Sequence, residues 1–225
     1  MSKRQIGTLV IIVVFALLVG PVIFKRLRDS AVVDGKRLDQ VSTHRTAEQL
    51  QIMGKAPDFV FTDQHGTKVS NADFKGQVYL VEFFFSSCPS ICPKMNAHMK
   101  QVSEHFFGNP HLSIASISID PETDTPEVLQ AYAKRLGARS SQWHFLTGDY
   151  DVTMELANKG FNVYAGKNDK VAGGFEHSGL VALVDQKGNI RCRKDAYGNP
   201  ILYYDGLEQR GVQDLMADIQ LLLNE

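Results

Sequence analysis

The stretch of sequence that decides the fold runs from Val78 to Met95 and reads VYLVEFFFSSCPSICPKM. Its first part, Val78 to Phe85, is dense in β-branched and aromatic residues, which is typical of a central strand covered on both faces. The two prolines that follow delay a helix and then open it near Lys94, because proline is tolerated in a first helical turn. The stretch therefore predicts a buried strand that leads directly into a helix.

The same stretch places two thiols at the junction between strand and helix. Cys88 and Cys92 are separated by three residues, so the pair can close a disulfide or open to face one metal ion. The helix dipole and the free N–H groups at a helix start stabilise thiolates, and thiolates prefer Cu(I) or zinc to hard cations. A purely stabilising disulfide is the weaker interpretation, since closing so short a loop gives little entropic gain.

Strands and helices alternate on both sides of this junction. A hairpin is expected first, and an amphipathic helix closes the chain. The expected strands are 58–62, 67–69, 78–85, 112–119, 143–146, 180–184 and 190–194, and the expected helices are 94–107, 125–136, 149–159 and 212–223. This order predicts an α/β protein with a thioredoxin-like fold and an N-terminal β-hairpin.

One histidine is the candidate for a third ligand. His177 lies in the glycine-rich stretch 173–179, just before the strand that starts at Leu180. In a thioredoxin-like topology this loop faces the cysteines. Thioredoxins carry a proline there that seats substrate peptides, whereas this chain has no proline from 127 to 199. A lone histidine is more often structural or solvated, but its place in this loop favours a role as a ligand.

Three further residues have two interpretations each. Glu82, inside the apolar strand, either tunes thiol protonation from beneath the site or points to an exposed edge. Asp120 ends the neighbouring strand at the edge where open α/β sheets place ligands, and it is equally a turn-former before Pro121. Glu82 and Asp120 are therefore candidates to support the ligands from behind. Cys192 is interpreted as a packed or surface thiol rather than a third redox partner.

The N-terminal region predicts a membrane anchor. Ile6 to Phe24 is uncharged and strongly apolar, and as a helix it would reach roughly 28 Å, close to the hydrocarbon thickness of a bilayer. Residues 1–24 are therefore expected to be the anchor, residues 25–56 a polar tether and residues 57–225 the thioredoxin-like domain. Lysine and arginine flank both ends of the apolar run, so the charges alone do not orient it.

Composition excludes several classes of protein. The chain has 225 residues, with 24 Lys and Arg against 25 Asp and Glu and a formal net charge of -1. This balance disfavours nucleic-acid binding by bulk charge. Hydrophobic residues at 44% and charged residues at 22% exclude wholesale disorder. A pair of cysteines plus one distant cysteine does not make a disulfide framework.

Taken together, the motifs of residues 56–225 resemble the Sco/SenC family. The motifs are the Pro57-Asp58-Phe59 entrance, the phenylalanine-rich strand into CPSICPKM, the run Ser118 to Pro126, Leu146-Thr147-Gly148, His177-Ser178 and Tyr204-Asp205-Gly206. The resemblance implies a metallochaperone that binds one copper through Cys88, Cys92 and His177. It also implies a role in delivering copper to, or preparing, the CuA site of cytochrome c oxidase.

The resemblance also implies partners and a location. The partners would be the copper-bearing subunit of the oxidase, a thiol reductant and membrane lipid at the N-terminal helix. The domain would lie on the extracytoplasmic, periplasmic side of a bacterial inner membrane, or in the intermembrane space of a mitochondrion.

Two matters stay open at the level of sequence. The alternative function is a membrane-anchored thiol:disulfide oxidoreductase acting on exported proteins, with Cys88 as the attacking thiol. The chain also departs from the family at residues 192–201, which look like an insertion that lengthens the last hairpin. No role follows for this insertion from the sequence.

Overall fold

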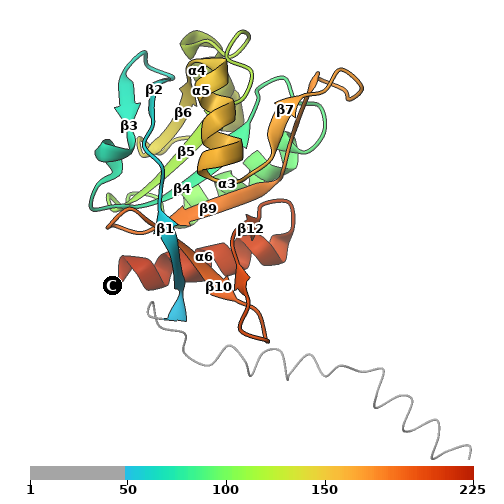
Figure 1. Ribbon diagram of the computed structural model, residues 1–225. Helices are drawn as coiled ribbons and strands as arrows, with labels where there is room; N and C mark the ends of the chain where they lie inside the picture. The colour runs from blue at the N-terminus through green and yellow to red at the C-terminus, as the bar shows by residue number, and fades with distance from the viewer. Residues whose placement is uncertain (1–48) are drawn as a thin grey trace, which may run out of the picture. The chain divides into compact units, whose positions relative to one another are not determined.

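The computed structural model describes residues 49–225, which form a mixed β-sheet with helices against its faces (Figure 1). The sheet order is β1-β10-β9-β4-β5-β6-β2-β3. The predicted anchor at residues 1–24 lies outside the described residues, as does most of the predicted tether. Within residues 49–225, no helix is both long and apolar enough to cross a membrane.

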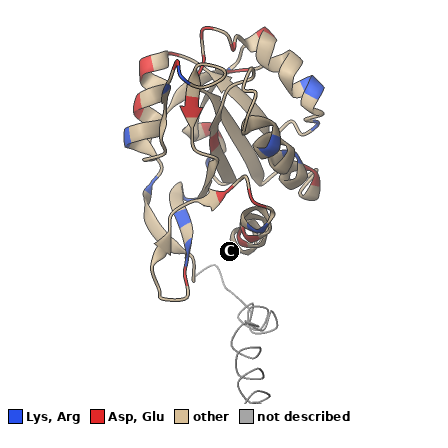
Figure 2. Ribbon diagram, turned by 90° about the vertical axis from the view of Figure 1, so that its right-hand side faces the viewer, with Lys and Arg blue, Asp and Glu red and all other residues tan. Residues whose placement is uncertain are grey.

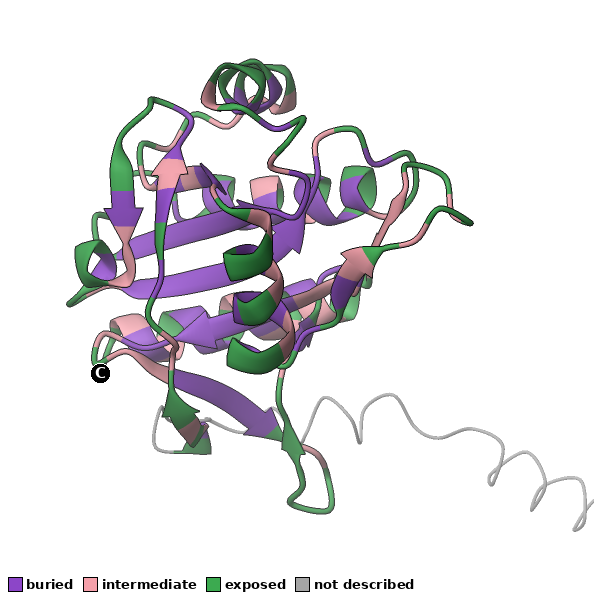
Figure 3. Ribbon diagram, turned by 45° about the horizontal axis from the view of Figure 1, so that its top comes forward, coloured by how far each residue is buried: buried purple, intermediate pink, exposed green. Residues whose placement is uncertain are grey.

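The centre of the sheet is the strand that opens the decisive stretch. β4 (Val78–Phe84) pairs in parallel with β5 (Leu112–Ser118) and antiparallel with β9 (Leu180–Val184). Every residue of β4 and β5 is buried (Figure 3). β6 (Trp143–Thr147) extends the parallel part beyond β5. The prediction of a central strand covered on both faces is confirmed.

The predicted N-terminal hairpin is also confirmed. β2 (Val60–Asp63) and β3 (Lys68–Ser70) pair antiparallel, and β2 joins the sheet beside β6. The turn between them closes on the Asp63 side chain, whose Oδ1 accepts the backbone N–H groups of His65 and Thr67, both at 2.9 Å. A short 3-10 helix, η3 (Asn71–Phe74), leads on to β4.

The helices agree with the sequence prediction to within about two residues at most ends. Thr125 caps one of them by accepting the Val128 N–H. In chain order they are α3 (Cys92–His105), α4 (Pro126–Leu136), α5 (Tyr150–Glu155), the π-helical turn η4 (Leu156–Gly160) and α6 (Gln209–Leu223). Figure 1 shows α5 in front of the sheet and α3 behind it.

The structure differs from the sequence prediction at the other end of the sheet. β1 (Gln51–Lys55) falls within the predicted tether, yet it pairs antiparallel with β10 (Asn189–Lys194). The free edge of β10 offers backbone groups that need partners, and β1 supplies them. The preceding Leu50 is buried, and its carbonyl oxygen accepts from the Arg191 guanidinium. The folded structure therefore begins before residue 57.

Four short strands complete the fold. β11 (Pro200–Ile201) pairs with β10, and β12 (Tyr204–Asp205) pairs with β9. β7 (Ala165–Lys167) and β8 (Phe175–His177) form a separate two-stranded sheet. The sequence analysis left residues 165–177 without strands, because their glycines and polar residues hide the alternation of a strand.

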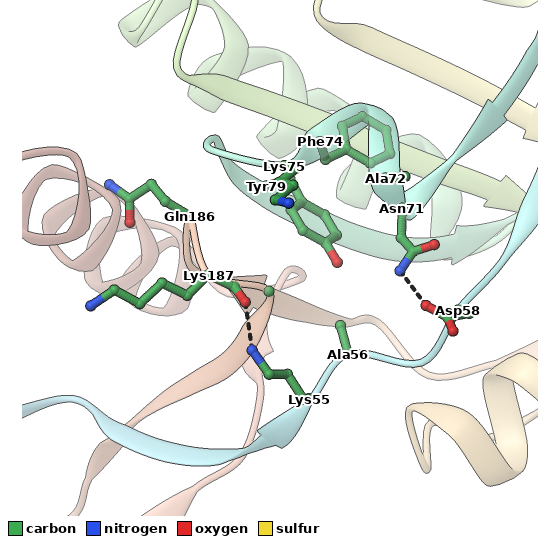
Figure 4. Close-up of a pocket in the computed structure, with 11 residues that line it drawn as sticks. Lys55, Ala56, Asp58, Asn71, Ala72, Phe74, Lys75, Tyr79, Gln186 and Lys187 are labelled. Carbon is green, nitrogen blue, oxygen red and sulfur yellow. Dashed lines mark hydrogen bonds between the residues drawn. The ribbon is translucent and has the colours of Figure 1, made fainter.

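A cavity of about 370 Å³ lies beside the amino end of β4, between η3, β1 and the turn that joins β9 to β10 (Figure 4). Tyr79 and Phe74 line it together with Lys55, whose ammonium group donates to the carbonyl oxygen of Lys187 at 2.6 Å. Neither of the paired cysteines lines this cavity. It is therefore separate from the site described next.

Candidate metal centre

The two cysteines occupy the turn between the buried strand β4 and the first residue of α3. The Cys88 N–H donates to the carbonyl oxygen of Phe85 at 3.3 Å, which bends the chain back after the strand. Cys92 begins α3, and Pro93 follows it where the helix needs no N–H donor. The Cys92 N–H points at Cys88 Sγ at 3.5 Å. A free N–H group at the helix start thus meets a sulfur, as the sequence predicts.

Both thiols are reduced and nearly covered. Cys88 is 8% exposed and Cys92 is 1% exposed, and neither forms a disulfide. Cys88 Sγ also lies 3.6 Å from Ser90 Oγ. Cys88 is therefore the sulfur nearer to solvent, and Cys92 is the sulfur nearer to the core.

His177 reaches this pair from the end of β8. Its Cα is paired with that of Ala165 in β7, which fixes the strand beneath the ring. Nε2 lies 2.8 Å from Cys92 Sγ, and Nδ1 lies 2.9 Å from the carbonyl oxygen of Ser178. A carbonyl oxygen only accepts, so Nδ1 carries the proton and Nε2 presents its lone pair to the sulfurs. Nε2 is the atom through which a neutral imidazole would bind a metal.

The three side chains therefore form one group of ligand atoms. The two Sγ atoms and the imidazole nitrogen all lie within 4.8 Å of one another, and all three residues are buried. Two sulfurs and one nitrogen favour a soft or borderline ion such as Cu(I), Cu(II) or zinc over magnesium or calcium. The tautomer of His177 also suits metal binding, because the proton is on Nδ1, which faces away from the sulfurs, and Nε2 is free to bind the ion.

The two thiols differ strongly in acidity. Hydrogen bonding from the Cys92 side chain, followed by contacts with His177, the Cys92 N–H and Ser90, lowers the pKa of Cys88 to about 3 against the opposing effect of burial. The same hydrogen bond, acting with burial, raises the pKa of Cys92 above its ordinary value. A dithiol of this kind carries its first negative charge on Cys88, the more accessible sulfur.

Glu82 is buried, so its placement at an exposed edge is wrong. Its side chain is fully buried in β4. Ser116 Oγ donates to Oε1 at 2.5 Å, and Trp143 Nε1 donates to Ser116 Oγ at 2.9 Å. Oε2 has no hydrogen-bond partner among the described residues. Burial therefore raises the pKa of Glu82 to about 7, and only the Ser116 hydrogen bond opposes it.

Asp124 supports the loop before the cysteines. Asp124 is fully buried, and its carboxylate accepts the N–H and the hydroxyl of Ser86 and the hydroxyl of Ser118. The Asp120 carbonyl oxygen accepts the N–H groups of Thr123 and Asp124, so Asp120 forms the turn. Asp120 does not join the group of ligand atoms. The sequence analysis overlooked Asp124, although it lies in the same run of the chain.

A second set of hydrogen bonds holds the His177 loop to the cysteine helix. The Gly206 N–H donates to the carbonyl oxygen of Gly179 at 2.8 Å. His98 of α3 lies with Nδ1 2.7 Å from the carbonyl oxygen of the same Gly206. A side chain on Gly206 would stand 2.9 Å from the Gly179 oxygen, which explains the glycine. The Tyr204-Asp205-Gly206 motif thus links α3 to the loop that carries His177.

Aromatic side chains cover the remaining side of the group. The Phe85 ring lies edge-on to the His177 ring with centroids 6.0 Å apart, and it packs against Phe175 at 5.4 Å. Gly173 has a φ of 92° and passes so close to Phe85 that a Cβ would lie 2.9 Å from the ring. This packing helps to bury His177, which is 8% exposed.

A thioredoxin-like domain with a dithiol and a histidine gathered at one sheet edge defines the class of protein. Residues 47–209 match the model of the SCO1/SenC family. The SCO1 protein homolog of Bacillus subtilis (strain 168) is 32% identical over 167 residues, which are 72% of this chain and 79% of the relative. The chain belongs to the SCO1/SenC family.

Solved structures share the fold. BsSco, described as a member of the Sco family of cytochrome c oxidase assembly proteins and as having a disulfide switch, superposes with a TM-score of 0.65 at 29% identity, over 77% of this chain and 97% of its own. ScoI of Bradyrhizobium japonicum, solved with copper bound, superposes with a TM-score of 0.58 at 23% identity, over 75% and 98% of the two chains. The thioredoxin-like fold predicted from the sequence is confirmed.

Proposed function

We propose that this protein is a copper metallochaperone that holds one copper ion through Cys88, Cys92 and His177. The observation that carries the proposal is the convergence of the three ligand atoms within 4.8 Å of one another, from two separate segments of the chain. The copper-bound state of the related ScoI supports the choice of metal. The reduced thiols and the Nδ1–H tautomer of His177 are the forms that a metal requires.

The site suits an ion that is carried and then released. Among residues 49–225, three side chains converge, so an acceptor protein can add its own ligand to the ion before the first ligands leave. Cys88 is the more exposed sulfur and the more acidic thiol, so it is the ligand that an acceptor reaches first. Cys92 lies deeper, and the backbone contacts described above hold Cys92 and His177 in place.

The recipient we propose is the copper-bearing subunit of cytochrome c oxidase, at its CuA site. The support is the family, since the related BsSco is described as an oxidase assembly protein. We place the domain outside the cytoplasm, in the periplasm of a bacterium or in the intermembrane space, held there by residues 1–24. A thiol reductant would keep the cysteine pair open for the next ion.

Copper titration of the full chain in detergent tests the metal site. We expect one equivalent of Cu(II) to bind with thiolate-to-copper charge-transfer absorption. The substitutions Cys88→Ser, Cys92→Ser and His177→Ala should each weaken binding by at least about tenfold, because each removes one ligand. Cys192→Ser and His105→Ala are matched controls, since Cys192 is buried in β10 and His105 is exposed on α3.

An unchanged affinity and an unchanged spectrum in His177→Ala would contradict the assignment of the third ligand. Copper binding by protein in which Cys88 and Cys92 have been oxidised to a disulfide would contradict the assignment of both sulfurs.

Thiol:disulfide exchange is the second candidate, and the acidity of Cys88 favours it. A pKa of about 3 makes Cys88 a thiolate at neutral pH, ready to attack a disulfide, with Cys92 placed to resolve the mixed disulfide. His177 contributes to that acidity, but the exchange reaction does not need it as a ligand. The reductase would be favoured if the protein turns over a model disulfide efficiently and if this activity survives His177→Ala.

A further inference from the structure

The β10–β11 hairpin carries apolar side chains that the domain leaves uncovered. Tyr197 at its tip is 91% exposed, and Ile201 at the end of β11 and Leu202 just after it are 44% and 41% exposed. Single exposed apolar residues are ordinary, but three within six positions on one projection form a surface suited to binding. The hairpin includes residues 192–201, which the sequence analysis interprets as an insertion.

The tip is a rigid turn. Asp195 Oδ1 accepts the N–H groups of Tyr197 at 2.8 Å and Asn199 at 2.9 Å, and its Oδ2 accepts from the Asn199 amide at 3.1 Å. Gly198 supplies the left-handed backbone conformation that the turn needs, with a φ of 88°. Little conformational entropy is therefore lost when Tyr197 is held against another surface.

The chain from the N-terminal region enters the domain at the root of this hairpin. Gln51 of β1 is paired with Cys192 of β10, and Ile201 of β11 is paired with the next residue, Arg193. β1 and β11 therefore flank β10 on opposite edges, and β11 continues into β12, which pairs with β9. β1 runs antiparallel to β10 with Gln51 opposite Cys192, so β1 begins at the end of β10 from which the hairpin extends.

We propose that the tip of this hairpin contacts the lipid bilayer that holds the predicted anchor at residues 6–24. Tyrosine and aliphatic side chains are favoured at the level of lipid headgroups, where one end of the ring is apolar and the other wet. The tether enters at the hairpin root, so the anchor keeps this part of the domain at a high effective concentration near the membrane. Exposed Lys194 adds a positive charge next to the tip.

Lipid contact would also orient the metal centre. β10 and β4 both run antiparallel to β9, so they run in the same direction. The hairpin therefore extends from the same end of the strands as Cys88 and Cys92, which follow the carboxyl end of β4. Contact through the tip would turn this edge toward the membrane surface. The inference is independent of copper, because it rests on the hairpin and on the entry of the chain.

A tryptophan placed at the tip tests the inference. The one natural tryptophan, Trp143, is 1% exposed and gives a constant background. The full chain carrying Tyr197→Trp would be reconstituted into phosphatidylcholine vesicles with brominated acyl chains. The matched control is Val128→Trp, because Val128 is 38% exposed on α4, which lies at the opposite end of the domain from the hairpin in Figures 1 and 3.

We expect the emission of Tyr197→Trp to shift to shorter wavelength and to be quenched several-fold more strongly than that of Val128→Trp. Adding Ile201→Ser and Leu202→Ser to the Tyr197→Trp chain should reduce the quenching. Equal quenching at the two positions, or water-like emission at residue 197 in vesicles, would overturn the inference. So would a tryptophan at 197 that is shielded only when a partner protein is added.

Discussion

Cys92 and His177 are 85 residues apart in the chain, yet their side chains meet at 2.8 Å. Their environments then divide the chemistry between the residues. Cys88 is surrounded by donors and is acidic, whereas Cys92 is covered and holds its proton. His177 keeps its proton on Nδ1 because the Ser178 carbonyl oxygen accepts there. At the scale of residues, neighbouring groups therefore set the protonation state of each side chain in the site.

Glu82 gives a prediction at this scale. Its pKa in the folded protein is about 7, above the ordinary value of 4.5, because its carboxylate is buried. The folded state therefore binds a proton that the unfolded state releases between pH 4.5 and 7. This contribution to stability is fully present below about pH 4.5 and is lost as the pH rises through 7, by about 3 kcal/mol. Glu82→Gln should remove this loss.

Denaturant unfolding of the two proteins at pH 4.5, 6 and 8 measures the effect. The free energy of unfolding of Glu82→Gln, relative to that of the natural chain, should increase as the pH rises. Parallel pH profiles would show that the carboxyl group has an ordinary pKa in the folded protein.

At the scale of elements, buried ion pairs fasten α6 to the hairpin strands. Arg193 of β10 donates to both carboxylate oxygens of Asp218, at 2.8 and 2.9 Å, and Asp214 pairs with the same guanidinium. The Tyr204 hydroxyl donates to Asp218 Oδ2 at 2.8 Å. Tyr204 begins the segment whose Gly206 binds the loop of His177. The closing helix thus supports the third ligand through β12.

Asp218→Ala tests this support. The substitution leaves Arg193 and the Tyr204 hydroxyl buried without their main acceptor, and we expect a loss of about 3 kcal/mol in the free energy of unfolding. The exposed Arg210, 4.0 Å from Asp214, offers a control. Arg210→Ala should change the free energy of unfolding by less than about 0.5 kcal/mol. Equal effects of the two substitutions would show that the buried pair adds nothing.

The sequence predicts elements well where local patterns are strong. The dense run of β-branched and aromatic residues places β4, and the capping Thr125 places α4, within two residues of their ends. β1 and β8 are different, because neither Gln51–Lys55 nor Phe175–His177 has a strong strand pattern of its own. Each becomes a strand only because the edge of a neighbouring strand supplies hydrogen-bond partners.

At the scale of the whole molecule, charge is spread without a dominant sign. Figure 2 shows acidic and basic residues intermixed over the face in view, in keeping with the net charge of -1. Recognition of a partner by long-range attraction alone is therefore weak. Contact chemistry at the dithiol and at the hairpin tip has to supply specificity.

The extent of the folded domain gives a prediction at this scale. A chain that begins at residue 57 lacks β1 and also lacks Leu50, whose carbonyl oxygen accepts from buried Arg191. We expect such a chain to unfold several degrees below one that begins at residue 49, because β10 becomes a free edge and Arg191 loses an acceptor. Thermal unfolding followed by circular dichroism measures the difference. Equal melting temperatures would show that β1 adds nothing to stability.

The sequence by itself determined the buried strand, the dithiol at the start of a helix and the candidate histidine, because local composition and spacing carry those signals. Only the tertiary structure decided which nitrogen of His177 faces the sulfurs, that Asp124 supports the cysteine loop, and that Glu82 is buried. It also decided that residues 51–55 join the sheet. These outcomes depend on contacts between segments distant in the chain, and a local pattern does not encode such contacts.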